Sequence, residues 1–445
     1  MLQHHRSLGA ASGRRTQSSA RAAVFRAPLV CVAQASADFS GKEVLVIGGT
    51  GRVGSSTCEA LLKSFPGLKV SVASRSKSSF DAAVARRPGM RGTTFTACDV
   101  EDAKSVMAAV KGKQLVIHAA GPFQQTQNHS VLEAAIETKT PYVDICDDMH
   151  YSEQSKEKYG AACKAAGVPA IISAGIYPGT SNVMAAHIIS IARKEYDENW
   201  NYRTPAPGEG SEPKLLRYSY YTAGSGGAGP TILETSFLLA GEPVVVYKEG
   251  EKYVLPPISN RREVDFGPGI GRKGLYLYNL PETESAKKYL RVPGVSARFG
   301  TDPFFWNWAM WLTARLVPRA MLNDRKFVRE FAKLSDPFVR AVDKWAGEAV
   351  AMRIEVDFQD GKNSCGLFVH RYLGQSMGYS VAGFAQAVLK GQTAPGVWYP
   401  EEKEALSDRR EFLKFAATGC ERFDLNRSAW ALESEPKQVG GLIYW

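Results

Sequence analysis

Four glycines near the start of the chain could bring the backbone against a phosphate group. The segment VLVIGGTGRVGSSTCEALLK (44–63) places them at Gly48, Gly49, Gly51 and Gly54. Residues 44–47 have the composition of a buried parallel strand, and residues 55–63 that of a helix. The spacing fits both GxGxxG from Gly49 and GxxGxxG from Gly48, so the register stays open. In both registers, the missing Cβ atoms and the unpaired N–H groups at the helix start predict a dinucleotide-binding turn.

The next apolar run ends in residues that discriminate between the two nicotinamide cofactors. Domains that bind NAD commonly carry Asp or Glu about 20 residues after the glycines, where the carboxylate accepts the ribose hydroxyls. Here the run ends with Ser74 and Arg75, and no carboxylate stands at that position. Arg75 can pair with a 2′-phosphate, and Ser74 can donate a hydrogen bond to it. The sequence therefore predicts NADP, with NAD less favoured; the alternative is that Arg75 only solvates a loop.

Two later strand ends are predicted to border the same cofactor. Asp99 and Val100 end the third apolar run and would lie beside the adenine. Ala120 and Gly121 end the fourth run and would pass under the dinucleotide near the nicotinamide. Both assignments follow from strand order.

These residues require a sheet that brings the ends of several strands to one edge. Apolar runs at 68–74, 93–100, 114–121, 141–146 and 168–175 alternate with helical patterns near 78–87, 102–110, 125–138 and 150–166. Alternation at this spacing predicts an α/β fold with a Rossmann doubly wound parallel sheet and right-handed crossovers. After residue 195 a linker rich in Pro and Gly leads to further strands and helices, with a hairpin near 359–363, which predicts a second α+β domain.

The composition narrows the classes of partner. Residues 1–38 contain five Arg and one acid, Asp38, and are rich in Ser and Ala, as organelle transit peptides are. We expect a chloroplast location, with the mitochondrion as alternative, and a mature protein that begins near Phe39. This segment contributes +4 of the formal charge of +10, and no basic stripe in the rest predicts nucleic-acid binding. The seven cysteines have no zinc spacing, so no metal site is predicted.

The run PFFWNWAMWLTA (303–314) is dense in aromatic residues and has no charge. Its twelve residues are too few to cross a bilayer, which needs about 20. Two interpretations stay open. One is an interfacial helix or lipid-facing cleft wall that makes peripheral membrane contact; the other is a domain or dimer interface.

Six motifs together resemble the saccharopine dehydrogenase-like oxidoreductases, most closely those of plant and algal plastids. They are GGTGRVG, HAAGPFQ, YVDICDD, GIYPGTSN, SGGAGPT and PGVWYPEE. The resemblance implies a Rossmann domain at 39–176, an inserted α+β substrate and dimerisation domain at 177–400, and a segment at 401–445 that packs back on the first domain. It also implies a homodimer.

One motif departs from the family pattern and affects the predicted catalytic residues. The family commonly reads Y-x-D-x-x-G-E here, whereas this chain has Asp147 at the glycine position and Asp148 at the glutamate position. Asp148 and the phenol of Tyr177 are the predicted proton donors. No arginine pair is evident that would clamp an amino-dicarboxylate, so saccharopine is not predicted as the substrate.

The predicted function is that of an NADP-dependent oxidoreductase. It would pass hydride to or from an imine, a carbonyl or an activated double bond of a small molecule, lipid-like substrates included. A short-chain dehydrogenase is rejected, because the sole Tyr-x-x-x-Lys spacing, Tyr399 and Lys403, is interrupted by Pro400 and lies far from the Rossmann domain. The alternative is a non-catalytic NADP-binding plastid scaffold or membrane-associated protein.

Overall fold

The apolar runs of the first part of the chain pair as six parallel strands, as their spacing predicts, and one late strand completes a seven-stranded parallel sheet. The strands are β1 (Glu43–Ile47), β2 (Lys69–Ser74), β3 (Thr94–Ala97), β4 (Leu115–His118), β5 (Tyr142–Asp144), β6 (Pro169–Ile171) and β15 (Gly396–Trp398). Their order is β15-β6-β5-β4-β1-β2-β3, so the winding reverses between β1 and β4. Ligands of doubly wound sheets bind at the carboxyl edge of such a reversal.

The computed structural model describes residues 38–197, 201–224 and 230–434, all within one unit of the chain, Ala35–Trp445. The predicted transit peptide, apart from Asp38, lies outside the described residues. Most of the SGGAGPT motif lies outside them too.

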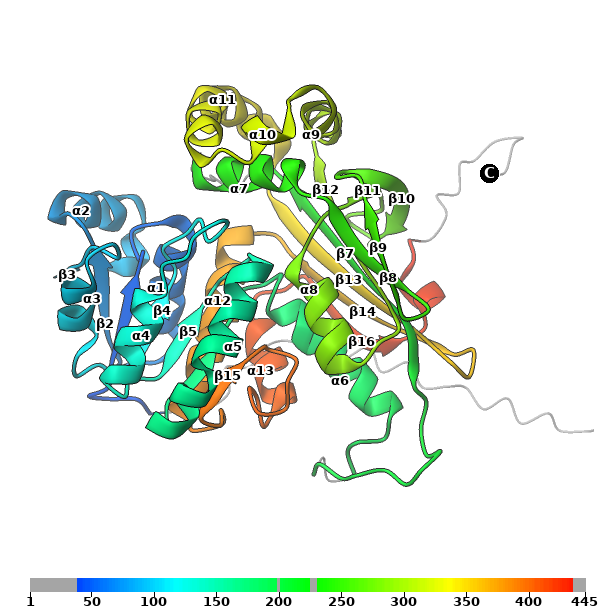
Figure 1. The fold of residues 1–445 in the computed structure, drawn as a ribbon, viewed down its shortest axis with the longest axis horizontal. Helices are drawn as coiled ribbons and strands as arrows, with labels where there is room; N and C mark the ends of the chain where they lie inside the picture. Colours follow the sequence, from blue (N-terminus) through cyan, green and yellow to red (C-terminus); the bar gives the residue numbers. More distant parts are fainter. Residues whose placement is uncertain (1–37, 198–200, 225–229, 435–445) are drawn as a thin grey trace, which may run out of the picture. The chain divides into compact units, whose positions relative to one another are not determined.

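Helices cover both faces of this sheet (Figure 1). They are α1 (Arg52–Ser64), α2 (Lys77–Arg86), α3 (Ala103–Val110), α4 (Ser130–Glu137), α5 (Met149–Ala166) and α12 (Leu373–Leu389), with α13 (Arg409–Ala416) packed on α12. A further helix, α6 (Thr180–Ala192), packs on the second sheet. Helix α1 begins three residues earlier than predicted, because Gly51 has extended backbone (φ −71°, ψ 175°) and serves as its N-cap. Gly54 therefore lies inside the first helical turn.

A second, mixed sheet follows in the chain. Its main path is β10 (Ser259–Asp265), β11 (Arg272–Leu277), β12 (Gly294–Asp302), β7 (Pro213–Ala223), β13 (Ala349–Phe358), β14 (Asn363–His370) and β16 (Arg422–Arg427). The strands β8 (Val244–Lys248) and β9 (Glu251–Leu255) pair beside it, and β13 and β14 form the predicted hairpin. This is the predicted second α+β domain.

The predicted boundary at residue 400 differs from the structure in two places. The chain returns to the first sheet earlier, because α12 packs on α1 and β15 pairs with β6. The return depends on glycine, since a Cβ on Gly378 would lie 2.5 Å from the carbonyl oxygen of Ser56. After this return, β16 pairs with β14 of the second sheet, so residues 401–445 do not all pack on the first domain.

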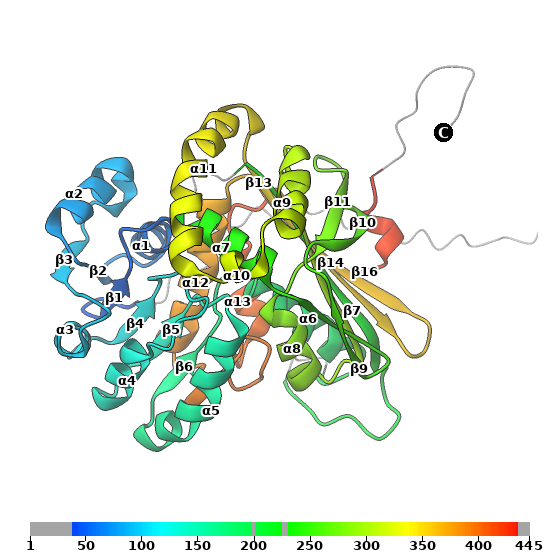
Figure 2. The same cartoon turned by 45° about the horizontal axis from the view of Figure 1, so that its top comes forward.

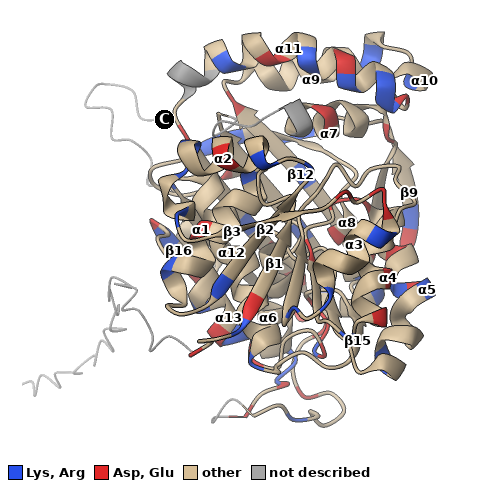
Figure 3. Cartoon of the chain, turned by 90° about the vertical axis from the view of Figure 1, so that its left-hand side faces the viewer, with Lys and Arg blue, Asp and Glu red and all other residues tan. Residues whose placement is uncertain are grey.

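A layer of helices lies over one end of the second sheet. It contains α7 (Pro230–Gly241), α9 (Phe305–Leu316), α10 (Arg319–Leu322) and α11 (Arg325–Ala346). Figures 1 and 2 show these helices together, and α7 contacts each of the other three. Figure 3 shows basic residues on α10 and α11 at this edge. A short helix, α8 (Pro281–Ser285), and a π-helical turn, Ala286–Leu290, precede β12.

Candidate functional site

Three of the four predicted glycines leave no room for a side chain. Gly48 has φ +77°, and a Cβ there would lie 2.6 Å from the carbonyl group of Ala119. A Cβ on Gly54 would lie 2.4 Å from the oxygen of Gly48, and one on Gly49 would lie 2.9 Å from the Val72 side chain. Among the four, only Gly51 has nearly enough space for a side chain, since a Cβ there would lie 3.1 Å from the oxygen of Gly48.

The contacts of these glycines distinguish the two registers that the sequence leaves open. Gly48 and Gly51 line a cleft, whereas Gly49 packs on β2 behind the turn. The N–H of Gly51 donates to the carbonyl of Gly48 at 2.9 Å, which closes the turn. Gly48, Gly51 and Gly54 therefore form the working GxxGxxG turn, and Gly51 faces the ligand space.

The first turn of α1 supplies hydrogen-bond donors to this cleft. Its N-cap, Gly51, has no side chain that could cap the helix, so the first N–H groups lack intrahelical acceptors. Such a helix start attracts a phosphate group. These features fit the pyrophosphate of a dinucleotide.

Both residues predicted to select the cofactor line the same cleft. Ser74 is partly buried and donates to the carbonyl of Ser76 at 3.1 Å, and Arg75 is exposed. Two further cations, Arg86 and Arg87, lie in the cleft wall. Arg86 is the last residue of α2 and Arg87 is its C-cap. No sequence pattern marked them, since only the folded helix brings them back to the glycine turn. Arg86 donates to the carbonyl of Thr50 at 2.9 Å, and Arg87 pairs with Glu59 at 2.8 Å.

The other predicted cofactor residues line the cleft as well. Asp99 and Val100 follow β3, while Ala120 and Gly121 follow β4. All four lie at the carboxyl edge of the sheet, where strand order places them. Their individual roles toward the adenine and nicotinamide stay predictions.

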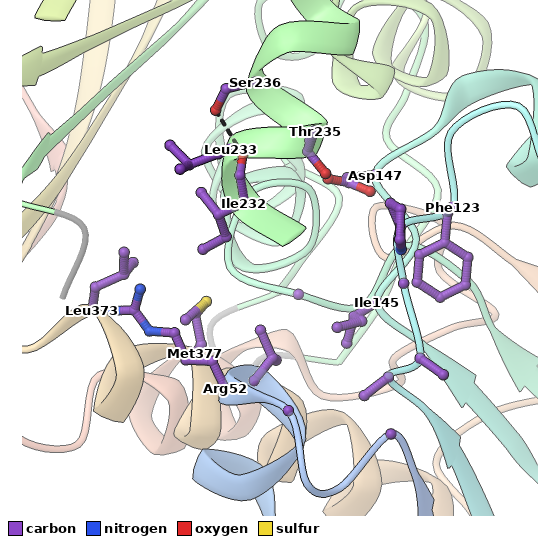
Figure 4. Close-up of a pocket in the computed structure, with 18 of the residues that line it drawn as sticks. Arg52, Phe123, Ile145, Asp147, Ile232, Leu233, Thr235, Ser236, Leu373 and Met377 are labelled. Carbon is purple, nitrogen blue, oxygen red and sulfur yellow. Dashed lines mark hydrogen bonds between the residues drawn. The ribbon is translucent and has the colours of Figure 1, made fainter. Parts of the chain in front are cut away.

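The cleft has a volume of about 1670 Å³ and continues beyond the nucleotide end. Its far part is lined by apolar side chains from α7, α9 and α11, among them Leu233, Phe237, Met310 and Phe331. Figure 4 shows Ile232 and Leu233 of α7 facing the space above Arg52 and Met377. One cavity thus joins a charged end at the glycine turn to an apolar end in the helical layer.

The adjacent acids Asp147 and Asp148 occupy different environments. Asp148 is buried and caps α5, accepting from the N–H of Tyr151 at 2.7 Å, and it is not among the residues that line the cleft. Asp147 lines the cleft and lies beside Thr235 of α7 (Figure 4). Burial raises the pKa of Asp147 to about 6, against a smaller lowering by the Gln124 side chain. The structure therefore brings Asp147, rather than Asp148, to the ligand space.

Comparison with known proteins identifies the first domain. Residues 44–171 match the family model of the saccharopine dehydrogenase NADP-binding domain. This segment is a saccharopine dehydrogenase-type NADP-binding domain. The resemblance predicted from the motifs and the choice of NADP are confirmed for it, and the plastid type stays a prediction. A search of curated proteins found no match.

One solved structure supports the fold over most of the chain. Apo saccharopine dehydrogenase (L-Glu forming) from Saccharomyces cerevisiae is similar over 87% of this chain and 100% of its own, with TM-score 0.59 and 15% identity. Pen from Bacillus thuringiensis matches 30% of this chain and 49% of its own, with TM-score 0.25 and 22% identity. At this identity the yeast enzyme shows a shared fold and leaves the substrate open.

Two more side chains lie in the cleft wall near the strand end that is predicted to border the nicotinamide. Tyr177 lines the cleft and stacks on Tyr220 with ring centroids 4.7 Å apart, and burial raises its pKa. His118 ends β4 and contacts the Phe123 ring edge-on at 5.0 Å. Burial lowers the pKa of His118 to about 3, so its imidazole is neutral. Sequence reasoning missed His118, which looked like one more residue of an apolar strand.

Two arginines of α11 reach the cleft from the helical layer. Arg325 donates to the carbonyl of Pro122 at 3.2 Å, and Arg329 pairs with buried Glu234 at 3.8 Å. The Nε atom of Arg325 has no hydrogen-bond partner among the described residues. No group of His, Cys, Asp and Glu placed to hold a metal ion occurs among the described residues either.

Proposed function

We propose that this protein is an NADP-dependent oxidoreductase that moves hydride to or from an imine, a carbonyl or an activated double bond. The observation that carries the proposal is the cleft itself, which joins the cofactor turn to Asp147 and Tyr177. Bound NADPH would supply a hydride, and the oxidised cofactor would accept one. Gly48, Gly51 and the start of α1 would hold the pyrophosphate, and Ser74 and Arg75 the 2′-phosphate.

Reduction of such a bond also needs a proton on the nitrogen, oxygen or neighbouring carbon. Asp147 can donate one when it is protonated, and its raised pKa keeps part of its population protonated near neutral pH. Tyr177 carries a neutral phenol that can donate to or orient the same atom. His118, as a neutral imidazole, can hold the substrate through one hydrogen bond.

The apolar end of the cleft supports a substrate with a substantial apolar part. Leu233, Phe237, Met310 and Phe331 would remove such a part from water. Arg325 stands at the margin of this end and can meet a polar or anionic group. An amphipathic small molecule fits this arrangement.

A hydride-transfer assay tests the proposal. Purified protein is incubated with NADPH and a panel of imines, aldehydes, ketones and enones that differ in chain length, and loss of NADPH absorbance is followed. We expect turnover with amphipathic members and a loss of about 10²-fold or more in Asp147→Asn. Asp148→Asn is the matched control and should keep most of the activity. Absence of turnover across the panel, with tight NADPH binding, would favour the non-catalytic scaffold.

A further inference from the structure

The outer faces of α9 and α11 hold most of the exposed large hydrophobic side chains of the described residues. Nine of fifteen lie in α9, at its N-cap Phe304, in α11 or in the adjoining α10. They are Phe304, Phe305, Trp308, Trp311, Leu312, Leu316, Met321, Leu334 and Phe338. We call them the aromatic face. Trp308 is 62% exposed and Leu334 78%, so a folded monomer leaves these side chains in water, and patches of this kind mark interaction sites.

A buried polar residue fixes the orientation of α9. Asn307 donates to the carbonyl of Thr301 at 2.7 Å, and the N–H of Thr301 donates to the Asn307 side chain at 3.0 Å. This pair holds one side of α9 against β12. Trp308 lies about 100° around the helix from Asn307, and both Trp308 and Trp311 remain exposed with α9 held in this position.

Basic side chains accompany the aromatic face. Residues 303–342 contain seven Lys and Arg and three Asp and Glu, and three of the cations, Arg325, Arg329 and Arg340, line the cleft. Two of the acids already pair with neighbouring cations, Glu330 with Lys333 at 2.7 Å and Asp336 with Arg340 at 2.5 Å. The third, Asp324, caps α11. Arg319 and Lys326 are exposed. The face is therefore apolar and net positive.

The aromatic face is continuous with the cleft. Trp306 and Phe338 both line the cleft, and their ring centroids lie 5.6 Å apart. Phe338 is also 61% exposed, so the apolar end of the cleft reaches the surface beside it. A molecule at this surface would have a short, apolar route inward.

We propose that α9 and α11 dock on the surface of an anionic lipid membrane through the aromatic face. Indole and phenyl rings favour the headgroup level of a bilayer, and Lys and Arg beside them attract anionic phosphates. Contact is peripheral: none of the described helices has the length and apolar composition that crossing a bilayer requires. A second copy of the chain is a poorer partner, because a two-fold interface would bring like net charges together.

Vesicle flotation tests the docking without any need for catalysis, so a failure of the proposed oxidoreductase activity leaves it unaffected. The probes are vesicles of equal parts phosphatidylglycerol and phosphatidylcholine, and vesicles of phosphatidylcholine alone. We expect the wild type to float with the mixed vesicles, to partition at least about tenfold less onto the neutral ones, and to dissociate as salt is raised.

Two double variants separate the apolar and the electrostatic contributions. Trp308→Ala with Trp311→Ala should reduce partitioning about tenfold or more. Arg319→Glu with Lys326→Glu should reduce it by at least about thirtyfold, since each lost cation costs roughly fivefold near an anionic surface and each new carboxylate is repelled by it. The matched controls are Trp430→Ala, which removes an exposed Trp elsewhere, and Lys104→Glu with Lys111→Glu, which changes the net charge equally. Both controls should float like the wild type.

NADPH titration and thermal melting verify that each variant is folded. If the tryptophan variant does not fold, the Arg319 and Lys326 variant decides alone. The proposal is overturned if the wild type does not float, or if this charge variant floats as well as its control. It is also overturned if the wild type is a dimer that stays off the vesicles and becomes a monomer in the tryptophan variant, because the face would then join two copies.

Discussion

At the scale of single residues, the neighbouring carboxylates of Asp147 and Asp148 differ because that of Asp148 accepts a backbone hydrogen bond. Asp148 is the N-cap of α5, and its carboxylate accepts a hydrogen bond from an N–H group of the first turn. Asp is one of the residues preferred at this position. Asp147 is left to point into the cleft. The sequence predicted a proton donor among the acids at this strand end, and the resemblance to the family motif favoured Asp148. Which of the two faces a ligand depends on the turn before α5, whose geometry no spacing rule supplies.

The pH profile should report Asp147 directly. If it donates the proton in reduction, activity requires its protonated form, so kcat/KM should fall about tenfold per pH unit above its pKa of about 6. Below that value the profile should level off. Asp147→Asn should abolish this limb, whereas Asp148→Asn should keep it and change the stability little, because Asn caps a helix about as well as Asp. A wild-type profile of kcat/KM that is flat between about pH 5 and 8 would exclude Asp147 as the donor, because a group with a pKa of about 6 loses its proton within this range.

Arg75 should set the preference between cofactors. Its guanidinium is the exposed cation at the predicted 2′-phosphate position, so Arg75→Ala should weaken NADPH binding by about 1–3 kcal/mol and leave NADH binding nearly unchanged. Lys77→Ala is the control, because Lys77 pairs with Asp81 and does not line the cleft. The measurement is nicotinamide fluorescence titration with both cofactors. Equal loss for NADPH and NADH would contradict the assignment.

At the scale of elements, the glycine turn followed from the sequence but its register did not. Four glycines within seven residues satisfy two patterns, and both place a helix next. The choice depends on which glycine contacts β2 and which faces the cleft, and these contacts come from strands far along the chain. The strands β2, β4, β5 and β6 were recognisable because buried parallel strands are continuous apolar runs.

Substitutions at two of these glycines should have different consequences. Gly51→Val should abolish NADPH binding with the fold retained, because its Cβ meets only the Gly48 oxygen at 3.1 Å and the added methyl groups enter the ligand space. Gly54→Val should unfold the domain, because a Cβ would lie 2.4 Å from backbone that cannot yield. Fluorescence titration and circular dichroism measure the two effects. A Gly51→Val variant that binds NADPH normally would mean that the glycine serves the turn alone.

At the scale of the whole molecule, the chain crosses between its two sheets more often than the sequence indicated. The strand β15 is only three residues long, and its apolar content, Val397 and Trp398, resembles that of an ordinary loop. Its partner β6 is distant in sequence, so local pattern carries no sign of the pairing. The packing partner of α12 could not be predicted either, since its apolar residues show that the helix is buried but not which sheet it covers. The apolar end of the cleft had one sign in the sequence, the run 303–314, for which a cleft wall was one of two interpretations, and Met310 of this run does line the cleft. The contributions of α7 and α11 to the same wall come from distant segments and had no such sign.

The packing of α12 on α1 should hold the two parts of the chain in one cooperative unit, and a pair of helical glycines tests this. Gly378→Ala places a Cβ 2.5 Å from the Ser56 carbonyl oxygen, so the helices must separate, at a cost of about 1–3 kcal/mol. Gly160→Ala in α5 is the control: nothing lies within 4 Å of its Cβ, and the gain in helix propensity should stabilise by up to about 1 kcal/mol. Urea unfolding followed by both tryptophan fluorescence and circular dichroism measures the change. We expect a single transition in every variant, lowered for Gly378→Ala and unchanged or raised for Gly160→Ala. Two separate transitions in the wild type, with only the first domain affected by Gly378→Ala, would show that α12 does not couple the sheets.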